Sequence, residues 1–253
     1  MSQPASASLE CFGRYRPEAG AYVQGLRRGE PSCGEAIGEL VEIVDRVFAG
    51  GEKENFVVRQ DARVVASAEA HYRANLTPGG ASWNARAEHM HVTAQKLLEV
   101  HGAESRGIVW AHNTHIGDAR ATTMHEQQRV NIGQLSRQDM GDGEVFAIGF
   151  GTHRGAVKAG RSWGASMERM NVPAGMAESY EEIFHRLGEP ALWVIFDEAM
   201  RENATFRERR GHRAIGVIYH PEREAPGNYV PTDLFGRYDA FIFIDETNPV
   251  RPL

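Results

Sequence analysis

Apolar residues recur at the three- and four-residue spacing of an α-helix through most of the first hundred positions. This spacing predicts helices over residues 32–48, 54–76 and 84–101. Residues that commonly end helices follow each of them, namely Gly50-Gly51, Thr77-Pro78-Gly79-Gly80 and Gly102. We therefore expect a helical N-terminal portion at about residues 30–102.

After residue 102, short apolar runs rich in Ile, Val and aromatic residues replace the helical spacing. These runs predict strands over residues 107–111, 145–150, 192–196, 214–219 and 240–244. They lack polar alternation, which is typical of strands covered on both faces in a mostly parallel sheet. Helical spacing over residues 131–140 and 179–187 supplies helices between strands. The sequence predicts an α/β fold, with a helical portion (1–102) packed against a mostly parallel mixed sheet with flanking helices (103–253).

The composition is that of an ordinary globular protein, because 42% of its 253 residues are hydrophobic and 25% are charged. The net charge is −6 and the basic residues are dispersed, so no basic surface is expected for nucleic acid or anionic lipid. No run approaches the roughly 20 apolar residues of a membrane helix, and the first nine residues lack signal-peptide character. We expect a cytoplasmic protein without nucleic-acid or membrane partners, in which Cys11 and Cys33 remain reduced.

Polar side chains crowd the segment that follows the first predicted strand. Residues 112–120 read His-Asn-Thr-His-Ile-Gly-Asp-Ala-Arg. Ligands of open α/β sheets bind beyond the carboxyl ends of the strands, so a site is expected here. A merely solvated loop would account for one isolated histidine. Two histidines together with Asn, Asp and Arg favour a functional role.

The spacing of His112 and His115 fits more than one kind of chemistry. With a nearby carboxylate, two imidazoles could bind a metal ion, but no helical His-Glu-x-x-His pattern and no neighbouring cysteine support this. The imidazoles could instead act as general acid or base, or as donors to an oxyanion. No Gly-x-Ser-x-Gly segment occurs, so water would be the nucleophile. We expect no metal and no cofactor, and a histidine-based metal-binding protein remains an alternative.

Residues 110–120, Trp-Ala-His-Asn-Thr-His-Ile-Gly-Asp-Ala-Arg, resemble the Trp-Ala-His-Asn-x-His segment of the erythromycin esterase family. Other segments are also similar to the family, namely residues 82–86, 131–135, 149–152, 213–219 and 238–247. The resemblance covers most of the chain from Cys11 to Leu253. It implies metal-independent hydrolysis of a carboxylic ester by water. In the best-known members the substrate is the macrolactone ring of erythromycin, and the result is antibiotic resistance.

The resemblance also exposes a departure from the family pattern. The histidine of a Gly-Glu-x-x-His-Gly motif is regarded as the base of the family, and this motif occurs nowhere in the 253 residues. By family comparison the chain begins past the N-terminal half, so we expect a truncated, partial domain. Loss of a general base typically costs ~100- to 10,000-fold in rate. The main alternative to an esterase is therefore a non-catalytic remnant or binding subunit that needs a partner chain.

An incomplete sheet would also leave an apolar strand edge at residues 108–111, which invites association. We expect a homo-oligomer or a complementing N-terminal chain to cover this edge. The small-molecule partner implied by the resemblance is an ester or a macrolactone.

His112 matches the family's essential second histidine, and we predict that His112 and His115 are catalytic. Arg86, Asn113 and Asp118 are predicted to bind substrate, Arg86 through its planar guanidinium. The alternatives are a surface ion pair for Arg86 and a turn cap for Asp118. Two histidines that follow predicted strands could reach the same rim, His153 and His220. The others are predicted to face solvent or support the site, namely His71, His89, His91, His101, His125, His185 and His212.

Overall fold

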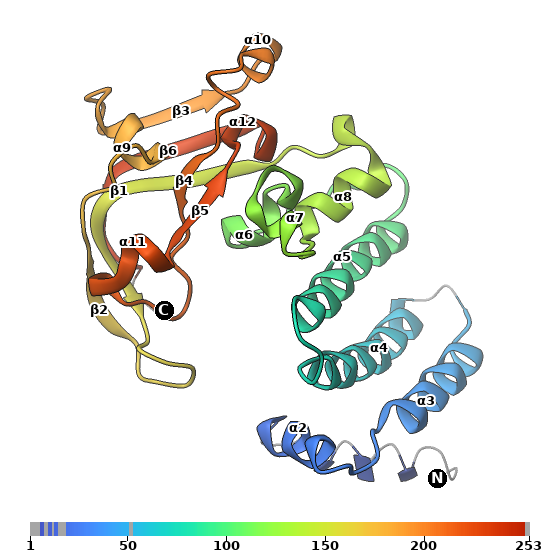
Figure 1. Ribbon diagram of the computed structural model, residues 1–253. Coiled ribbons are helices and arrows are strands. Elements are labelled where there is room, and N and C mark those ends of the chain that lie inside the picture. The colour runs from blue at the N-terminus through green and yellow to red at the C-terminus, as the bar shows by residue number, and fades with distance from the viewer. Residues whose placement is uncertain (1–5, 8–9, 12, 15–18, 51–52, 251–253) are drawn as a thin grey trace. The chain divides into compact units, whose positions relative to one another are not determined.

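The structure is a computed structural model and describes residues 6–7, 10–11, 13–14, 19–50 and 53–250. The chain divides into two compact units, a helical unit of residues 1–108 with 127–130 and a mixed unit of residues 109–126 with 131–253. The helical unit contains α2 (Ala19–Arg27), α3 (Gly34–Val47), α4 (Lys53–Ala74) and α5 (Ala81–His101) (Figure 1). The last three helices confirm those predicted from the apolar spacing. Helix α3 packs on α4, and α4 packs on α5.

A disulfide joins Cys11 to Cys33, whose Cα atoms are 5.5 Å apart. The prediction of two reduced thiols is therefore wrong. Cys33 is buried in the core of the helical unit with Tyr22 and Ile37. The Tyr22 hydroxyl accepts a hydrogen bond from the Cys33 N–H (2.9 Å) and donates one to the buried Glu69 carboxylate (2.8 Å). The tertiary fold brings the cysteines together, which their sequence spacing alone did not indicate.

The mixed unit contains a four-stranded sheet of order β2-β1-β6-β3. Its strands are β1 (Ile148–Ala159), β2 (Glu168–Val172), β3 (Ala191–Ile195) and β6 (Ala240–Thr247). Strands β1 and β6 are parallel, whereas β2 and β3 each pair antiparallel with their neighbour. A second antiparallel pair consists of β4 (Arg210–Arg213) and β5 (Tyr229–Thr232). The predicted α/β class with a mixed sheet is confirmed, but among the described strand pairs only β1–β6 is parallel, so the expectation of a mostly parallel sheet is wrong. Apolar runs indicate burial of a strand and do not specify the direction of its neighbour.

Short helices connect and cover these strands. They are α6 (Asn113–Ile116), η1 (Ala119–Ala121), α7 (Thr123–Glu126), α8 (Ile132–Met140), η2 (Asp142–Glu144), α9 (Tyr180–His185), α10 (Glu198–Glu202), η3 (Pro221–Arg223), α11 (Glu224–Gly227) and α12 (Leu234–Arg237). Helices α8 and α9 confirm the two helices predicted in this region. The side chains of Asn131 and Ser179 cap them by accepting backbone N–H groups at 2.9 and 3.3 Å.

The core of the mixed unit lies on one face of the large sheet. Phe184 of α9 stacks on Phe241 and Phe243 of β6, with ring centroids 5.2 and 5.5 Å apart. On neighbouring β1, a Cβ atom at Gly149 would lie 2.7 Å from the Tyr238 ring. The absence of a side chain at Gly149 therefore lets buried rings approach the β1 backbone.

The opposite face of the sheet is apolar and exposed. Phe150 and Trp193 both pair in register with Ile242, so the three side chains share this face. Trp193 and Ile195 of the edge strand are 67% and 60% exposed. An exposed apolar face of this kind marks an interaction surface.

Two predicted strands are wrong. Residues 107–111 form no strand, and Ile108 and Trp110 are 94% and 87% exposed. Residues 214–219 make only an isolated bridge from Ile218 to Gly160. A strand requires a hydrogen-bonded neighbour, and an apolar run specifies the side chains without specifying that neighbour. Within the described residues, no helix is both long enough and apolar enough to cross a membrane.

Reduction of the Cys11–Cys33 disulfide is expected to lower the free energy of unfolding of the helical unit by about 3 kcal/mol, because the bond closes a loop in the unfolded chain. Urea unfolding with and without reductant measures this change. The Cys11→Ser variant should be less stable and should not respond to reductant. Two thiols that alkylate readily in the folded, oxidised protein would contradict the disulfide.

Candidate functional site

His112 lies immediately before α6 and acts as its N-terminal cap. Its Nδ1 accepts a hydrogen bond from the Thr114 N–H at 3.2 Å and lies 2.9 Å from the Thr114 hydroxyl. Part of the ring is exposed, but the protein packed around it removes enough water to lower its pKa. A hydrogen bond to the Ile215 carbonyl opposes this shift, and the charge of Arg237 reinforces it. His112 is therefore held as a neutral imidazole at the start of α6.

Asn113 attaches the start of α6 to the edge of β1. Its Nδ2 donates to the Phe150 carbonyl at 2.6 Å, and its Oδ1 accepts from the Phe150 N–H at 3.1 Å. One side-chain amide thus satisfies both polar groups of a β1 residue, as a neighbouring strand would. The Asn113 carbonyl also accepts a hydrogen bond from the buried Arg237 guanidinium at 3.0 Å.

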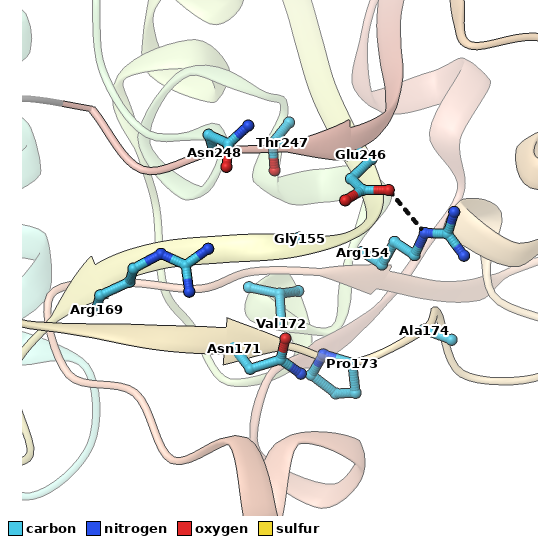
Figure 2. Close-up of a pocket in the computed structure, with 10 residues that line it drawn as sticks. All are labelled: Arg154, Gly155, Arg169, Asn171, Val172, Pro173, Ala174, Glu246, Thr247 and Asn248. Carbon is cyan, nitrogen blue, oxygen red and sulfur yellow. Dashed lines mark hydrogen bonds and ion pairs between the residues drawn. The ribbon is translucent and has the colours of Figure 1, made fainter.

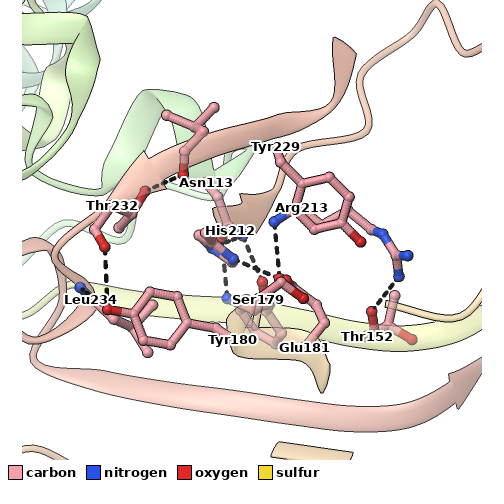
Figure 3. Close-up of polar contacts among 12 residues, drawn as sticks. Asn113, Thr152, Ser179, Tyr180, Glu181, His212, Arg213, Tyr229, Thr232 and Leu234 are labelled. Carbon is pink, nitrogen blue, oxygen red and sulfur yellow. Dashed lines mark hydrogen bonds and ion pairs between the residues drawn. The ribbon is translucent and has the colours of Figure 1, made fainter. Parts of the chain in front are cut away.

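The side chains of His212 and Glu181 form a buried pair, and His212 contacts Asn113 (Figure 3). The His212 Nδ1 is 2.7 Å from Glu181 Oε1, and its Nε2 is 3.3 Å from both the Asn113 Nδ2 and the Tyr238 hydroxyl. Glu181 and His212 are 0% and 1% exposed. The sequence predicted that His212 faces solvent or supports the site. In the structure its side chain is fully buried. Glu181 was missed, and nothing in the local sequence distinguishes it from a surface glutamate.

The electrostatics of this pair follow from burial. Burial lowers the pKa of His212 and outweighs the opposing effect of the Glu181 carboxylate. Burial also pushes the pKa of Glu181 upward, but His212 and the Arg213 N–H together bring it below its usual value. Burial raises the pKa of Tyr238 to about 12. The pair is therefore a neutral imidazole hydrogen-bonded to a carboxylate.

The remaining predicted residues have separate surroundings. Asp118 is buried, caps η1 through the Arg120 N–H at 2.9 Å and pairs with the Arg120 guanidinium at 2.6 Å. It thus has the contacts of a turn cap. His115 is half-buried on α6, three residues after His112. Arg86 is exposed on α5 in the helical unit. Their catalytic and substrate-binding roles remain predictions.

The pockets on the mixed unit include two that are lined by neither His112 nor His115. The first has a volume of about 250 Å³ and is bounded by β1, β2 and the end of β6 (Figure 2). In it, Arg154 pairs with Glu246 at 3.2 Å and Arg169 projects from β2. The second pocket, of about 320 Å³, includes His220. Among the described residues, no cluster of three or more His, Cys, Asp or Glu side chains is arranged to hold a metal ion.

A sequence model of the erythromycin esterase family matches residues 1–247. The chain belongs to the erythromycin esterase family. The match includes all five predicted site residues and both members of the buried His212–Glu181 pair.

Solved structures share the fold of this erythromycin esterase family member. They include a Bacillus cereus protein (15% identity, TM-score 0.65), a succinoglycan biosynthesis protein (16%, 0.64) and a histidine-to-asparagine mutant of the erythromycin esterase EreC in its open conformation (13%, 0.58). The alignments cover 96%, 96% and 97% of this chain and 63%, 57% and 57% of those chains, respectively. The chain therefore spans less than two thirds of the length of these proteins.

Asn113→Ala is expected to lower the free energy of unfolding of the mixed unit by about 1–3 kcal/mol, because it leaves the polar groups of Phe150 without their partner. Urea unfolding measures the loss. Replacement of the exposed His125 by Ala in α7 is the control and should change stability little. Equal stability of the Asn113→Ala and parent proteins would contradict the bridge to β1.

The stability of the mixed unit should fall as the pH drops below about 6.5. The pKa of buried His153 is lowered by burial and by His185, whose ring stacks on it at 3.8 Å. The unfolded chain, with a histidine pKa near 6.5, then binds more protons than the folded chain, and stability is lost toward the folded pKa. Urea unfolding at several pH values measures this slope. In His153→Asn, whose Oδ1 can replace Nδ1 as acceptor for the Gly175 N–H, the slope should be shallower. An unchanged slope would contradict the assignment.

Proposed function

We propose that this chain forms part of a carboxylic ester hydrolase in which water attacks an ester or lactone carbonyl. Family membership supports the reaction class, and the placement of His112 supports the site. The observation that carries the proposal is the fixed start of α6, where His112 and Asn113 are held beside the β1 edge by bonds from three different elements. Enzymes gain rate by holding polar groups in a fixed geometry in this way.

The proposed reaction needs three events at the ester. A base removes a proton from water as its oxygen bonds to the carbonyl carbon, the carbonyl oxygen gains negative charge, and the carbon–oxygen bond to the alcohol then breaks. The alcohol oxygen leaves with a proton. We assign the donor roles, toward the oxyanion or the leaving alcohol, to His112 and His115. Substrate-binding roles for Asn113, Asp118 and Arg86 stay predictions, since the Asn113 and Asp118 side chains are bonded to Phe150 and Arg120 and Arg86 lies in the helical unit.

The general base is not assigned to this chain. No Gly-Glu-x-x-His-Gly motif occurs in the 253 residues, and His112 Nδ1 already accepts a backbone N–H. We propose that a complementing polypeptide supplies the base and also covers the exposed apolar residues near Trp110. A macrolide substrate, with antibiotic resistance as the outcome, belongs to the same proposal.

A binding subunit without catalysis is the second candidate function. The absence of a Gly-Glu-x-x-His-Gly motif from the 253 residues favours it, because no general base is then assigned to this chain. This candidate predicts that an ester binds to the chain and is released unchanged, even when a complementing polypeptide is present.

The His112→Ala variant is expected to lower ester hydrolysis by about 100-fold or more when the chain is combined with a polypeptide that carries the Gly-Glu-x-x-His-Gly segment. Release of p-nitrophenol from p-nitrophenyl acetate and addition of one water to erythromycin, followed by mass spectrometry, measure the activity. The chain alone should be slower by a comparable factor.

Replacement of exposed His125 by Ala serves as the matched control and should leave the rate unchanged. If the chain alone hydrolyses both substrates and His112→Ala has no effect, the site assignment is wrong. Binding of erythromycin without turnover in the combined sample would favour the binding subunit.

A further inference from the structure

We infer that Glu181 and His212 are positioning residues, which orient the amide of Asn113 and thereby the His112-bearing start of α6. This inference rests on the proposed function for its catalytic consequence. Its structural part stands on a chain of hydrogen-bonded groups from α9, β4, α6 and β1. Figure 3 labels Glu181, His212 and Asn113 of this chain.

The orientation of the Asn113 amide is fixed by Phe150. The Phe150 N–H needs an acceptor and its carbonyl needs a donor, so Oδ1 faces the former and Nδ2 the latter. The second hydrogen of Nδ2 then points toward the His212 Nε2 at 3.3 Å. His212 Nε2 must therefore be an acceptor and carry no proton.

Glu181 selects the same tautomer from the other side of the ring. Its Oε1 accepts the His212 Nδ1–H at 2.7 Å and the Arg213 N–H at 3.0 Å, which keeps the imidazole proton on Nδ1. The Tyr238 hydroxyl, also 3.3 Å from Nε2, can donate to the same lone pair. Glu181 requires a proton on Nδ1 and Asn113 requires none on Nε2, so together they fix the Nδ1–H tautomer of His212, with which the Tyr238 hydroxyl is compatible.

Protonation of His212 would break this arrangement. An Nε2–H would face the Nδ2–H of Asn113, and two donors cannot share that contact. The charged groups that face His212 come from each element packed around it, namely Glu181, Arg213, Arg237 and, near the start of α6, His112. Burial, reinforced by the cationic Arg237 and Arg213, disfavours a positive imidazole and lowers the pKa of His212 despite the Glu181 carboxylate.

A buried polar pair is a costly way to fill space, since an apolar pair of similar size needs no hydrogen bonds. Unlike an apolar pair, the polar pair fixes the orientation of the groups bonded to it. The ring presents one lone pair to Asn113, while Arg237 holds the carbonyl of the same residue. Both the side chain and the backbone of Asn113 are then fixed, and His112 is the residue directly before it.

The first test is nuclear magnetic resonance of the ¹⁵N-histidine-labelled chain, which needs no enzyme activity. At neutral pH, His212 should show the Nδ1–H tautomer. Glu181→Gln keeps an acceptor oxygen and should retain this tautomer, whereas Glu181→Leu removes the acceptor and should change both the tautomer and the Asn113 side-chain amide signals. An Nε2–H tautomer or an imidazolium for His212 in the parent protein would overturn the inference, even if Glu181→Leu does not fold.

The second test uses the complemented hydrolase described above. Glu181→Leu should lower kcat by about 100-fold through misplacement of α6, with KM little changed, and Glu181→Gln should restore most of it. Equal loss of kcat in both variants, or a change in KM alone, would overturn the positioning role. Absence of hydrolysis in every sample would instead refute the proposed function, and the resonance measurement would still decide the inference.

Discussion

The placement of α6 on the sheet depends on the match between one side-chain amide and the backbone N–H and carbonyl of one β1 residue. The edge of β1 presents an N–H and a carbonyl at Phe150, and the Asn113 amide satisfies both, at 3.1 and 2.6 Å. Without such a partner these groups would carry the cost of unmade hydrogen bonds wherever water is excluded. Because the amide is directional, it also sets where α6 begins. The position of His112 therefore follows from the two hydrogen bonds between Asn113 and Phe150 at the edge of β1.

The elements that the sequence predicted correctly are those with local signals. Helix α8 follows the cap Asn131 and helix α9 follows the cap Ser179, and both carry apolar spacing inside. Strands were predicted less well, since pairing is a long-range property. Residues 214–219 are apolar but make only one bridge, whereas the polar sequence Arg-Gly-His-Arg of β4 is a strand because β5 pairs with it.

The candidate site was predictable to a similar extent. His112 lies within a recognisable family segment, so it could be singled out from sequence, although the strand predicted before it does not form and His112 instead begins α6. Glu181 and His212 are 31 residues apart and each lies in a polar stretch, which ordinarily indicates a surface. Only the packing of α9 against β4 places both in the interior. Sequence reasoning therefore found the exposed side of the site and missed the buried groups that orient it.

The failed strand at residues 107–111 has a physical explanation that connects to the site. Its apolar side chains suit a segment covered on both sides, yet Trp110 is exposed, and its ring lies tilted against that of Phe150 with centroids 5.9 Å apart. Phe150 is also the residue that Asn113 binds. A second copy or the proposed complementing chain could cover this apolar surface. The free energy of association would then become more favourable by roughly 25 cal/mol for each Å² of apolar surface buried. The covering chain would also lie beside His112. Burial of the apolar surface and supply of the missing general base would then both take place next to the β1 edge at Phe150.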